Sequence, residues 1–181
     1  MRRLLICLTV VLVGFGLTAS TAMASSPHFK RGGSPVCTVT GAGTNSTSTT
    51  CKATLAGLGQ ETLVINVTVS GSAVYQCQNN GGQTAPGQNR VLVGPVTAPT
   101  TIPADQIKNG NVSFTTNAAV LTAPETVTGA EAGCPNPNWT GVNPVLKTTD
   151  ITMTITQGGT LLFTCTASDP NGLSGTVPLS C

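Results

Sequence analysis

Six cysteines follow the first 24 residues of this sequence, and their spacing limits the chemistry that they could do. They are Cys37, Cys51, Cys77, Cys134, Cys165 and Cys181. Cysteine thiolates bind metals, exchange disulfides and act as nucleophiles. The sequence has no C-x-x-C pair, and its one histidine is not close to any of the six. Metal binding and thiol redox chemistry are therefore disfavoured, and we expect three structural disulfides.

Pairing cysteines that are neighbours in the sequence gives one set of disulfides, although six cysteines also permit other pairings. The first two cysteines fall on predicted strands that one loop separates, and the last two enclose the C-terminal tail. Joining these neighbours leaves Cys77 to pair with Cys134, which would close the longest loop and restrict the unfolded chain most. The expected pairs are Cys37–Cys51, Cys77–Cys134 and Cys165–Cys181.

Catalysis by a nucleophile and a histidine base has little support in the sequence. His28 is the only histidine, and it lies among the serines, prolines and glycines of residues 25–35. We expect this segment to be flexible. A Ser-His-Asp or Cys-His site needs a base that the fold holds in place. We therefore expect no catalytic function for His28 and no histidine-containing metal site.

The six acidic residues are scattered, so a hydrolase that uses carboxylates alone is the least favoured alternative. Glycosidases need two carboxylates that face each other across a cleft. Glu125 and Glu131 are close in sequence, but Thr128 followed by Glu131 fits a capping box over one helical turn. Residues 169–172 (DPNG) are typical of a turn and lack the further oxygen ligands of a calcium loop. We predict that the protein is not an enzyme and has no cofactor or metal.

Uncharged amides and a single tryptophan are the residues best suited to binding. Two predicted loops, 78–89 and 135–140, are rich in Asn and Gln, whose side chains both donate and accept hydrogen bonds. An exposed Trp139 could stack on a sugar ring, but its place soon after Cys134 favours burial or partial burial. The expected binding residues are Asn79, Gln83, Gln88, Asn136 and Trp139.

The first 24 residues have the pattern of a secretory signal peptide. Arg2 and Arg3 precede an apolar run over 4–15, and Ala22-Met23-Ala24 is a small-x-small cleavage signature. We expect cleavage before Ser25 and export to an oxidising compartment, secreted or extracellular. The mature chain is then expected to keep no membrane-spanning segment.

The composition excludes two classes of partner. Removing the first 24 of 181 residues leaves 157. Two of the eight basic residues, Arg2 and Arg3, are lost with them, so six basic residues balance six acidic residues and the formal charge is zero. No strongly basic surface remains for nucleic acid or anionic lipid. Only 8% of residues are charged, and hydroxyl and amide side chains provide the polar surface. A surface glycan or an extracellular protein is the partner that such a surface suits.

The elements that must position these residues are short strands. Apolar and polar residues alternate over 63–70 and over 151–156, where a Gly158-Gly159 turn follows. A turn at 71–72 is expected to return the chain as a hairpin, and Pro95 assigns residues 90–96 to a sheet edge or a strand end.

About seven to nine such strands and no long helical pattern predict an all-β fold, an immunoglobulin-like β-sandwich, with a closed barrel as the alternative. We expect a signal peptide over 1–24, a flexible segment over 25–35 and one disulfide-stapled domain over 36–181.

Four segments resemble an uncharacterised family of small exported microbial proteins: 77–82 (CQNNGG), 85–89 (APGQN), 108–114 (KNGNVSF) and 134–140 (CPNPNWT). The resemblance covers roughly residues 55–155 and implies no activity, cofactor or catalytic residue. It supports pairing Cys77 with Cys134, since both lie in matching segments. The sequence as a whole predicts a secreted, non-catalytic extracellular or cell-surface module with a binding or structural function. A carbohydrate-binding module that uses the amide-rich loops and Trp139 is the alternative.

Overall fold

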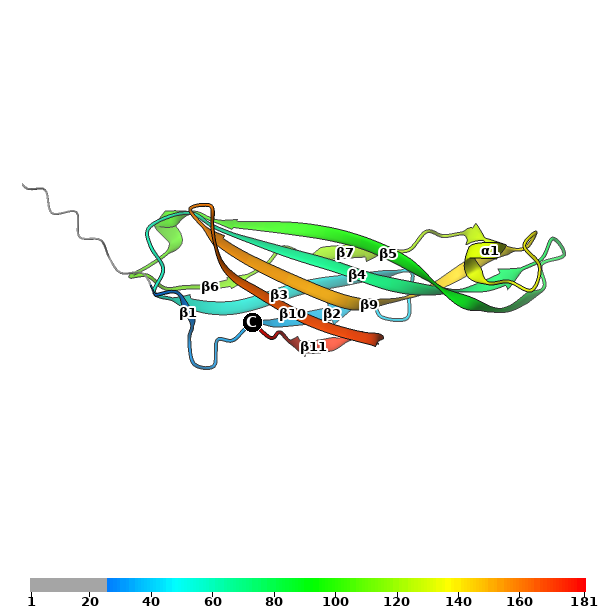
Figure 1. The fold of residues 1–181 in the computed structure, drawn as a ribbon, viewed down its shortest axis with the longest axis horizontal. Coiled ribbons are helices and arrows are strands. Elements are labelled where there is room, and N and C mark those ends of the chain that lie inside the picture. The colour runs from blue at the N-terminus through cyan, green and yellow to red at the C-terminus, as the bar shows by residue number, and fades with distance from the viewer. Residues whose placement is uncertain (1–25) are drawn as a thin grey trace, which may run out of the picture.

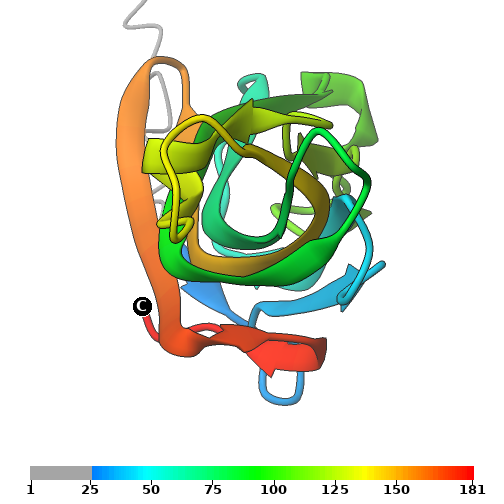
Figure 2. The same ribbon diagram turned by 90° about the vertical axis from the view of Figure 1, so that its right-hand side faces the viewer.

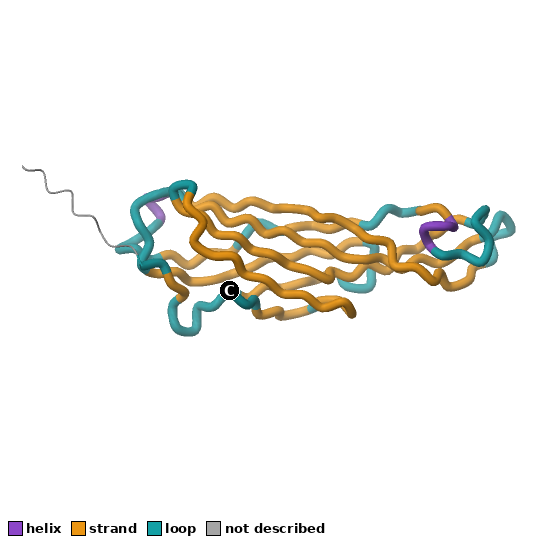
Figure 3. Tube along the Cα trace, in the orientation of Figure 1, coloured by secondary structure: helices purple, strands orange, loops and turns teal. Residues whose placement is uncertain are grey.

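The computed structural model describes residues 26–181, which form two antiparallel sheets packed face to face (Figures 1 and 3). This confirms the predicted all-β sandwich. Eleven strands form, against the expected number of about seven to nine, and two of them have only two residues each. The predicted signal peptide, residues 1–24, lies outside the described residues.

The first sheet is built around β3 (Ser46–Ala56), which pairs along both of its edges. A hairpin joins it to β2 (Val36–Thr40), which pairs in turn with β11 (Gly175–Pro178). Figure 2 shows this last strand, in red, beside the blue N-terminal strands. Three shorter strands complete the sheet: β1 (His28–Phe29), β6 (Val112–Thr115) and β7 (Ala119–Thr122).

The second sheet has the strand order β10-β9-β4-β5, and its strands are longer. The β9–β10 hairpin turns through Gly158 and Gly159, both with positive φ, as the sequence predicted. A short strand, β8, pairs with the start of β9. The bounds are β4 (Leu63–Gln78), β5 (Thr84–Ile102), β8 (Val127–Thr128), β9 (Thr140–Gln157) and β10 (Thr160–Leu173).

The core lies between the two sheets and follows the period-two pattern of the sequence. Ile65 of β4 lies opposite Ile155 of β9, and Val67 lies opposite Met153, with all four side chains fully buried. Complete burial of each such side chain stabilises the fold by about 1.5–3 kcal/mol. Alternation alone therefore fixes which face of these strands is internal.

Hydrogen bonds connect the sheets at both pairs of edges. Thr166 of β10 and Ser180, just after β11, exchange two backbone hydrogen bonds of 2.8 and 2.9 Å. On the opposite side, the Asn117 side chain donates to the Pro99 carbonyl oxygen of β5 at 2.7 Å. The two sheets keep separate sets of paired strands, so the fold is a sandwich whose sheet edges are linked by a few hydrogen bonds, and not a closed barrel.

Three strands of the second sheet run past the end of the first sheet. β4, β5 and β9 have 16, 19 and 18 residues, whereas the longest strand of the first sheet has 11. We call their projecting part, residues 73–91 and 127–146, the extension. It carries β8 and the single-turn helix α1 (Gly129–Ala132) at the right of Figure 1. We call its end, the turn 79–83 and the segment 133–139, the distal tip.

The prediction of a turn at 71–72 is wrong, because β4 runs through these residues without reversing. The register between β4 and β9 shifts between Ser70 and Gly71. A Cβ atom on Gly71 would lie 2.2 Å from the Lys147 carbonyl oxygen. Glycine is required here because a neighbouring strand approaches the backbone closely. A glycine required for this reason cannot be distinguished in the sequence from a glycine in a turn.

The predicted loop over 78–89 is also wrong. β4 ends at Gln78, residues 79–83 form a short turn, and β5 begins at Thr84. The prolines at 86, 95 and 99 lie within β5, which tolerates them because it is an edge strand, as Pro95 predicted. Each proline removes one amide donor from the unpaired edge.

The sequence predicted a flexible segment over 25–35. Its described residues, 26–35, are attached to the sandwich. β1 pairs with the end of β3, and the Lys30 amide donates to the Thr54 carbonyl oxygen at 2.9 Å. The Phe29 ring packs on Phe163 with centroids 4.6 Å apart. Backbone pairing and one aromatic contact therefore attach a segment that is otherwise mostly polar.

Candidate functional site

The structure forms the three expected disulfides: Cys37–Cys51, Cys77–Cys134 and Cys165–Cys181. The first and last join residues that are 14 and 16 positions apart. The second joins residues 57 positions apart and fastens the end of β4 to the segment that follows α1. The distal tip is therefore the place where covalent bonding holds distant parts of the chain together.

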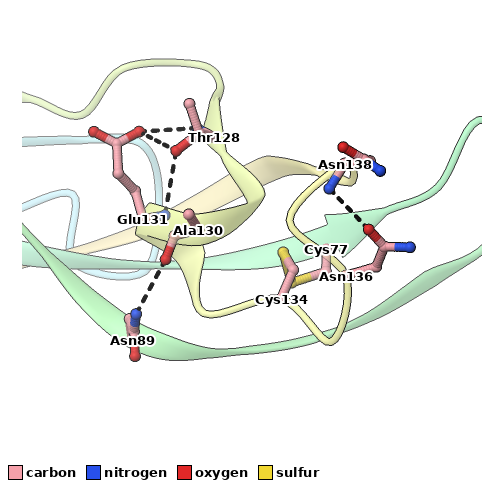
Figure 4. The surroundings of a disulfide bond; sticks show 8 residues. All are labelled: Cys77, Asn89, Thr128, Ala130, Glu131, Cys134, Asn136 and Asn138. Carbon is pink, nitrogen blue, oxygen red and sulfur yellow. Dashed lines mark hydrogen bonds between the residues drawn. A yellow bond between two sulfur atoms is a disulfide. The ribbon is translucent and has the colours of Figure 1, made fainter.

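Helix α1 is held by the capping box that the sequence predicted (Figure 4). The Thr128 hydroxyl oxygen accepts from the Glu131 amide at 3.2 Å. A Glu131 carboxylate oxygen accepts from the Thr128 hydroxyl at 2.7 Å and from the Thr128 amide at 2.9 Å. These two donors lower the pKa of Glu131, the hydroxyl more than the amide. The carboxylate is thereby committed to the helix cap.

The end of α1 packs tightly against β5. The helix stops at Gly133, which has a φ of 67°, and the Cys134 amide then donates to the Gly129 carbonyl oxygen at 2.7 Å. A Cβ atom on Gly133 would lie 2.6 Å from Cγ of Asn89, so the site has room only for glycine. The Asn89 side chain donates to the Ala130 carbonyl oxygen at 3.3 Å (Figure 4). α1 is thus linked to β5 directly and to β4 through the disulfide.

The strand register brings three predicted binding residues into one row at the distal tip. β4 ends between β5 and β9, with Gln78 opposite both Thr84 and Thr140, so the next residue outward on each strand is Asn79, Gln83 or Trp139. The Asn79 amide nitrogen donates to the Gln83 carbonyl oxygen at 3.0 Å. Trp139 is half-buried and packs against the core, as expected.

Two of the predicted binding amides hold turns through their side-chain oxygens. Oδ1 of Asn79 accepts from the amides of Gly81 and Gln83, both at 2.9 Å. Oδ1 of Asn136 accepts from the Asn138 amide at 2.9 Å (Figure 4). Each side chain keeps its NH2 group for another partner.

Asn136 joins the row at the tip, but Gln88 does not. The Trp139 amide donates to the Asn136 carbonyl oxygen at 3.1 Å, which places these two residues together. Gln88 lies within β5, in a bulge opposite Tyr75. Four of the five predicted residues therefore gather at the distal tip.

Tyr75 is the side chain around which the extension packs, and the sequence did not identify this function. Only 1% of its surface is exposed. Both neighbouring strands change register opposite it, between Val74 and Gln76. Its hydroxyl donates to the Pro124 carbonyl oxygen at 2.9 Å. Burial raises the pKa of the phenol, and the charge of Glu131 adds to the effect.

A spectrophotometric titration should detect this burial, because Tyr75 is the only tyrosine. We expect the phenol to titrate above its ordinary pKa of 10.0. With the folded-state pKa raised, the stability that neutral Tyr75 contributes is complete below pH about 10 and is lost as the pH rises through the folded-state pKa. The unfolding free energy of Tyr75→Phe should lack this dependence. A titration midpoint at or below 10.0 in the folded protein would contradict the expectation.

Four of the six acidic residues lie in different parts of the described structure. Asp150, in β9, accepts from the hydroxyls of Thr149 at 2.6 Å and Ser168 at 2.7 Å, which lower its pKa. Asp105 lies in the 3-10 turn η1 (Ala104–Gln106), beyond the end of β5 that is far from the tip. Glu125 lines a groove at the side of the extension, whereas Glu131 caps α1.

Asp169 and His28 have local partners. Oδ1 of Asp169 accepts from the Asn171 amide at 2.8 Å, which closes the predicted turn as a bulge within β10. His28 is exposed in β1, and its Nδ1 lies 2.8 Å from the Ser26 carbonyl oxygen. Across residues 26–181, no three His, Cys, Asp or Glu side chains are grouped so that they could hold a metal ion. In the same part of the chain, no helix has the length and apolar character needed to cross a membrane.

Sequence reasoning missed an amide pair on the outer face of the extension, the face opposite α1. Nδ2 of Asn143 donates to Oε1 of Gln76 at 3.0 Å. Asn143 lines two grooves, one of about 530 Å³ and one of about 380 Å³. The only signal in the sequence is Pro144, which disfavours helical backbone at the residue before it but does not place a side chain.

Comparison with known protein-family models finds no match to this chain, and comparison with curated proteins finds none. The family resemblance of the four segments therefore stays a prediction.

Proposed function

We propose that this protein is a secreted, non-catalytic extracellular or cell-surface module that binds its partner through the distal tip. The observation that carries the proposal is the construction of the tip. The Cys77–Cys134 bond, the cap of α1 and the turn 79–83 hold it in one arrangement beyond the end of the first sheet. A surface ordered in advance loses little conformational entropy on binding.

Export is supported by two independent features. Residues 1–24 have the pattern of a signal peptide. Three disulfides within residues 26–181 are typical of proteins in oxidising compartments.

The chemistry of the tip suits an uncharged partner. Gln83 and Asn136 are exposed, and Asn79 has an NH2 group left after its carbonyl oxygen is bonded. Amides donate and accept hydrogen bonds without the cost of removing a charge from water. A neutral glycan or an uncharged patch of an extracellular protein fits these groups.

The engagement of three of the six acidic side chains favours binding over catalysis. Glu131 is held in the cap of α1, Asp150 is bonded to hydroxyls, and Asp169 closes a turn. Hydrogen bonds hold the pKa values of Glu131 and Asp150 low, and a general acid needs the opposite shift.

A carbohydrate-binding module is the second candidate, and the row of Gln83, Asn79 and Trp139 favours it. An amide next to an aromatic ring is suited to a sugar, whose hydroxyls need partners and whose C–H groups are apolar. Trp139 is half-buried and offers only part of its ring. The amides would therefore carry most of the contact.

Binding of the labelled mature protein to envelopes of the cells that produce it tests the proposal. Gln83→Ala should weaken binding roughly threefold to tenfold, the effect of one or two net hydrogen bonds. Gln88→Ala is the matched control, because it removes the same exposed side chain from β5 outside the tip. Both variants should keep the wild-type melting temperature. Asn79→Ala and Asn136→Ala are less suitable because each also removes a bond that holds a turn.

Three outcomes would contradict the proposal. They are the absence of binding by the wild-type protein, equal binding by Gln83→Ala and wild type, and release of soluble products from the envelopes during incubation.

A further inference from the structure

The outer face of the extension has a composition that neither the core nor the distal tip explains. Val74 and Val145 lie opposite each other on neighbouring strands and are 41% and 43% exposed. In the next row, Gln76 lies between Val142 and Pro86. Apolar and amide side chains are thus adjacent on a surface that faces solvent.

The backbone at Asn143 is adapted to place one of these amides. Its φ is 51°, and Asn109 is the only other non-glycine residue with a positive φ among residues 26–181. Asn109 belongs to a tight turn, where this conformation is common, whereas Asn143 lies inside a strand. It occupies a bulge where β9 changes register against β4. Bulges redirect side chains, and residues with unusual φ values gather at functional sites.

The bond between Asn143 and Gln76 determines which polar atoms remain available. Oε1 of Gln76 accepts from Nδ2 of Asn143, and within residues 26–181 neither side chain has a further hydrogen-bond partner. The NH2 group of Gln76 is left as a donor and Oδ1 of Asn143 as an acceptor. A donor close to an acceptor matches two neighbouring hydroxyls of a sugar, because each hydroxyl both donates and accepts.

The two grooves beside the pair supply complementary contacts. The larger has further amides, on Asn45 and Gln78, and the smaller has the aliphatic side chains of Val74, Pro86 and Val145. Among all the lining residues only Glu125 is charged, and no lysine or arginine is present. A phosphorylated or sulfated ligand would therefore find no cation, whereas a neutral ligand would leave few charges desolvated.

We propose that the outer face of the extension binds a neutral oligosaccharide. Gln76 and Asn143 form its hydrogen-bonding pair, and Val74 and Val145 form its apolar platform. The inference deepens the proposed function by naming a ligand class and a second surface, and it rests on that proposal only in taking the protein to be a binding module. The distal tip does not contribute to it.

Asn143→Gly tests the amide without altering the backbone, because glycine adopts a φ of this sign without strain. Asn109→Gly is the matched control: it has the same native residue, the same φ of 51° and a position outside the extension. Gln76→Glu is a second variant, because Glu keeps an acceptor for Nδ2 of Asn143 and loses the outward NH2 donor. The probe is affinity electrophoresis of the mature protein through gels that contain soluble α-mannan, arabinan or β-glucan.

We expect wild type and Asn109→Gly to be retarded equally by at least one polymer. Asn143→Gly and Gln76→Glu should show dissociation constants raised roughly tenfold, the effect of losing one or two hydrogen bonds to the ligand. Circular dichroism should show an unchanged fold. No retardation of wild type in any of the gels would overturn the inference, as would equal retardation of wild type and both variants.

Two further outcomes separate this inference from the proposed function. If Gln83→Ala abolishes retardation and Asn143→Gly does not, the sugar binds at the tip, so the inference fails and the proposed function stands. If Asn143→Gly abolishes retardation and Gln83→Ala leaves envelope binding unchanged, the proposed use of the tip fails and the inference stands. Self-association in sedimentation velocity that Asn143→Gly abolishes would identify a second copy as the occupant and overturn the inference.

Discussion

Tyr75→Ala should lower the free energy of unfolding by about 3–5 kcal/mol, the usual cost of deleting a large buried aromatic side chain. Tyr75 is 1% exposed and is the largest of the fully buried side chains. It fills the space where both neighbouring strands change register, and its Cβ atom lies with side-chain atoms of β8 and α1 around Gly141. Removing the ring should leave a cavity, because the disulfide Cys77–Cys134 prevents the helix from collapsing into it. Urea unfolding would measure the change.

Tyr75→Phe is the control for this prediction. It keeps the ring and removes only the hydrogen bond to the Pro124 carbonyl oxygen. The expected cost is about 0.5–1.5 kcal/mol. Equal effects of the two substitutions would show that the hydroxyl, and not the packing of the ring, stabilises the extension.

The double substitution Cys77→Ala/Cys134→Ala should cost about 2–5 kcal/mol. The bond closes a loop between residues 57 positions apart, so its loss releases much conformational freedom in the unfolded chain. The folded state should also respond locally, because α1 would lose its covalent link to β4 and keep only its cap, its packing and the hydrogen bond from Asn89. We expect hydrogen exchange to accelerate over residues 127–139 and to stay slow over 63–69 in the core of β4.

Cys165→Ala/Cys181→Ala is the matched control. It also removes one disulfide, but this bond joins residues only 16 positions apart and links β10 to the C-terminus, outside the extension. It should leave exchange over 127–139 unchanged. Uniform acceleration along the chain in the Cys77→Ala/Cys134→Ala variant would contradict a local effect at the tip.

Alternation predicted the core because burial of one strand face leaves a direct mark on the sequence. The apolar residues that alternate over 63–69 and 151–155 form adjacent buried rows on the paired strands β4 and β9. The disulfides could be paired because two of them close short loops between adjacent segments, and the third pair was then left over. The capping box at Thr128 and Glu131 is equally local. These features depend on residues close in sequence or on solvent exposure alone.

The extension could not be predicted because its explanation lies in contacts between distant strands. Gly71 and Pro86 resemble turn residues, and only the close approach of Lys147 to Gly71 and the edge position of β5 explain them. Asn143 belongs to the same class, because a left-handed residue within a strand follows from the register of its neighbour. The row at the distal tip was predicted in part, since its amides are visible in sequence and their bonds within turns are not.

The prolines of β5 bear on how the protein behaves at high concentration. β5 pairs only with β4, and its other edge would offer a long template for a strand of a second molecule. Pro86, Pro95 and Pro99 interrupt the row of amide donors that such a strand would need. Residues 25–181 have a formal charge of zero, with six basic and six acidic residues, so electrostatic repulsion between copies of this part of the chain is weak. At this edge the prolines, and not charge, therefore oppose the addition of a strand, and added salt has little repulsion to screen.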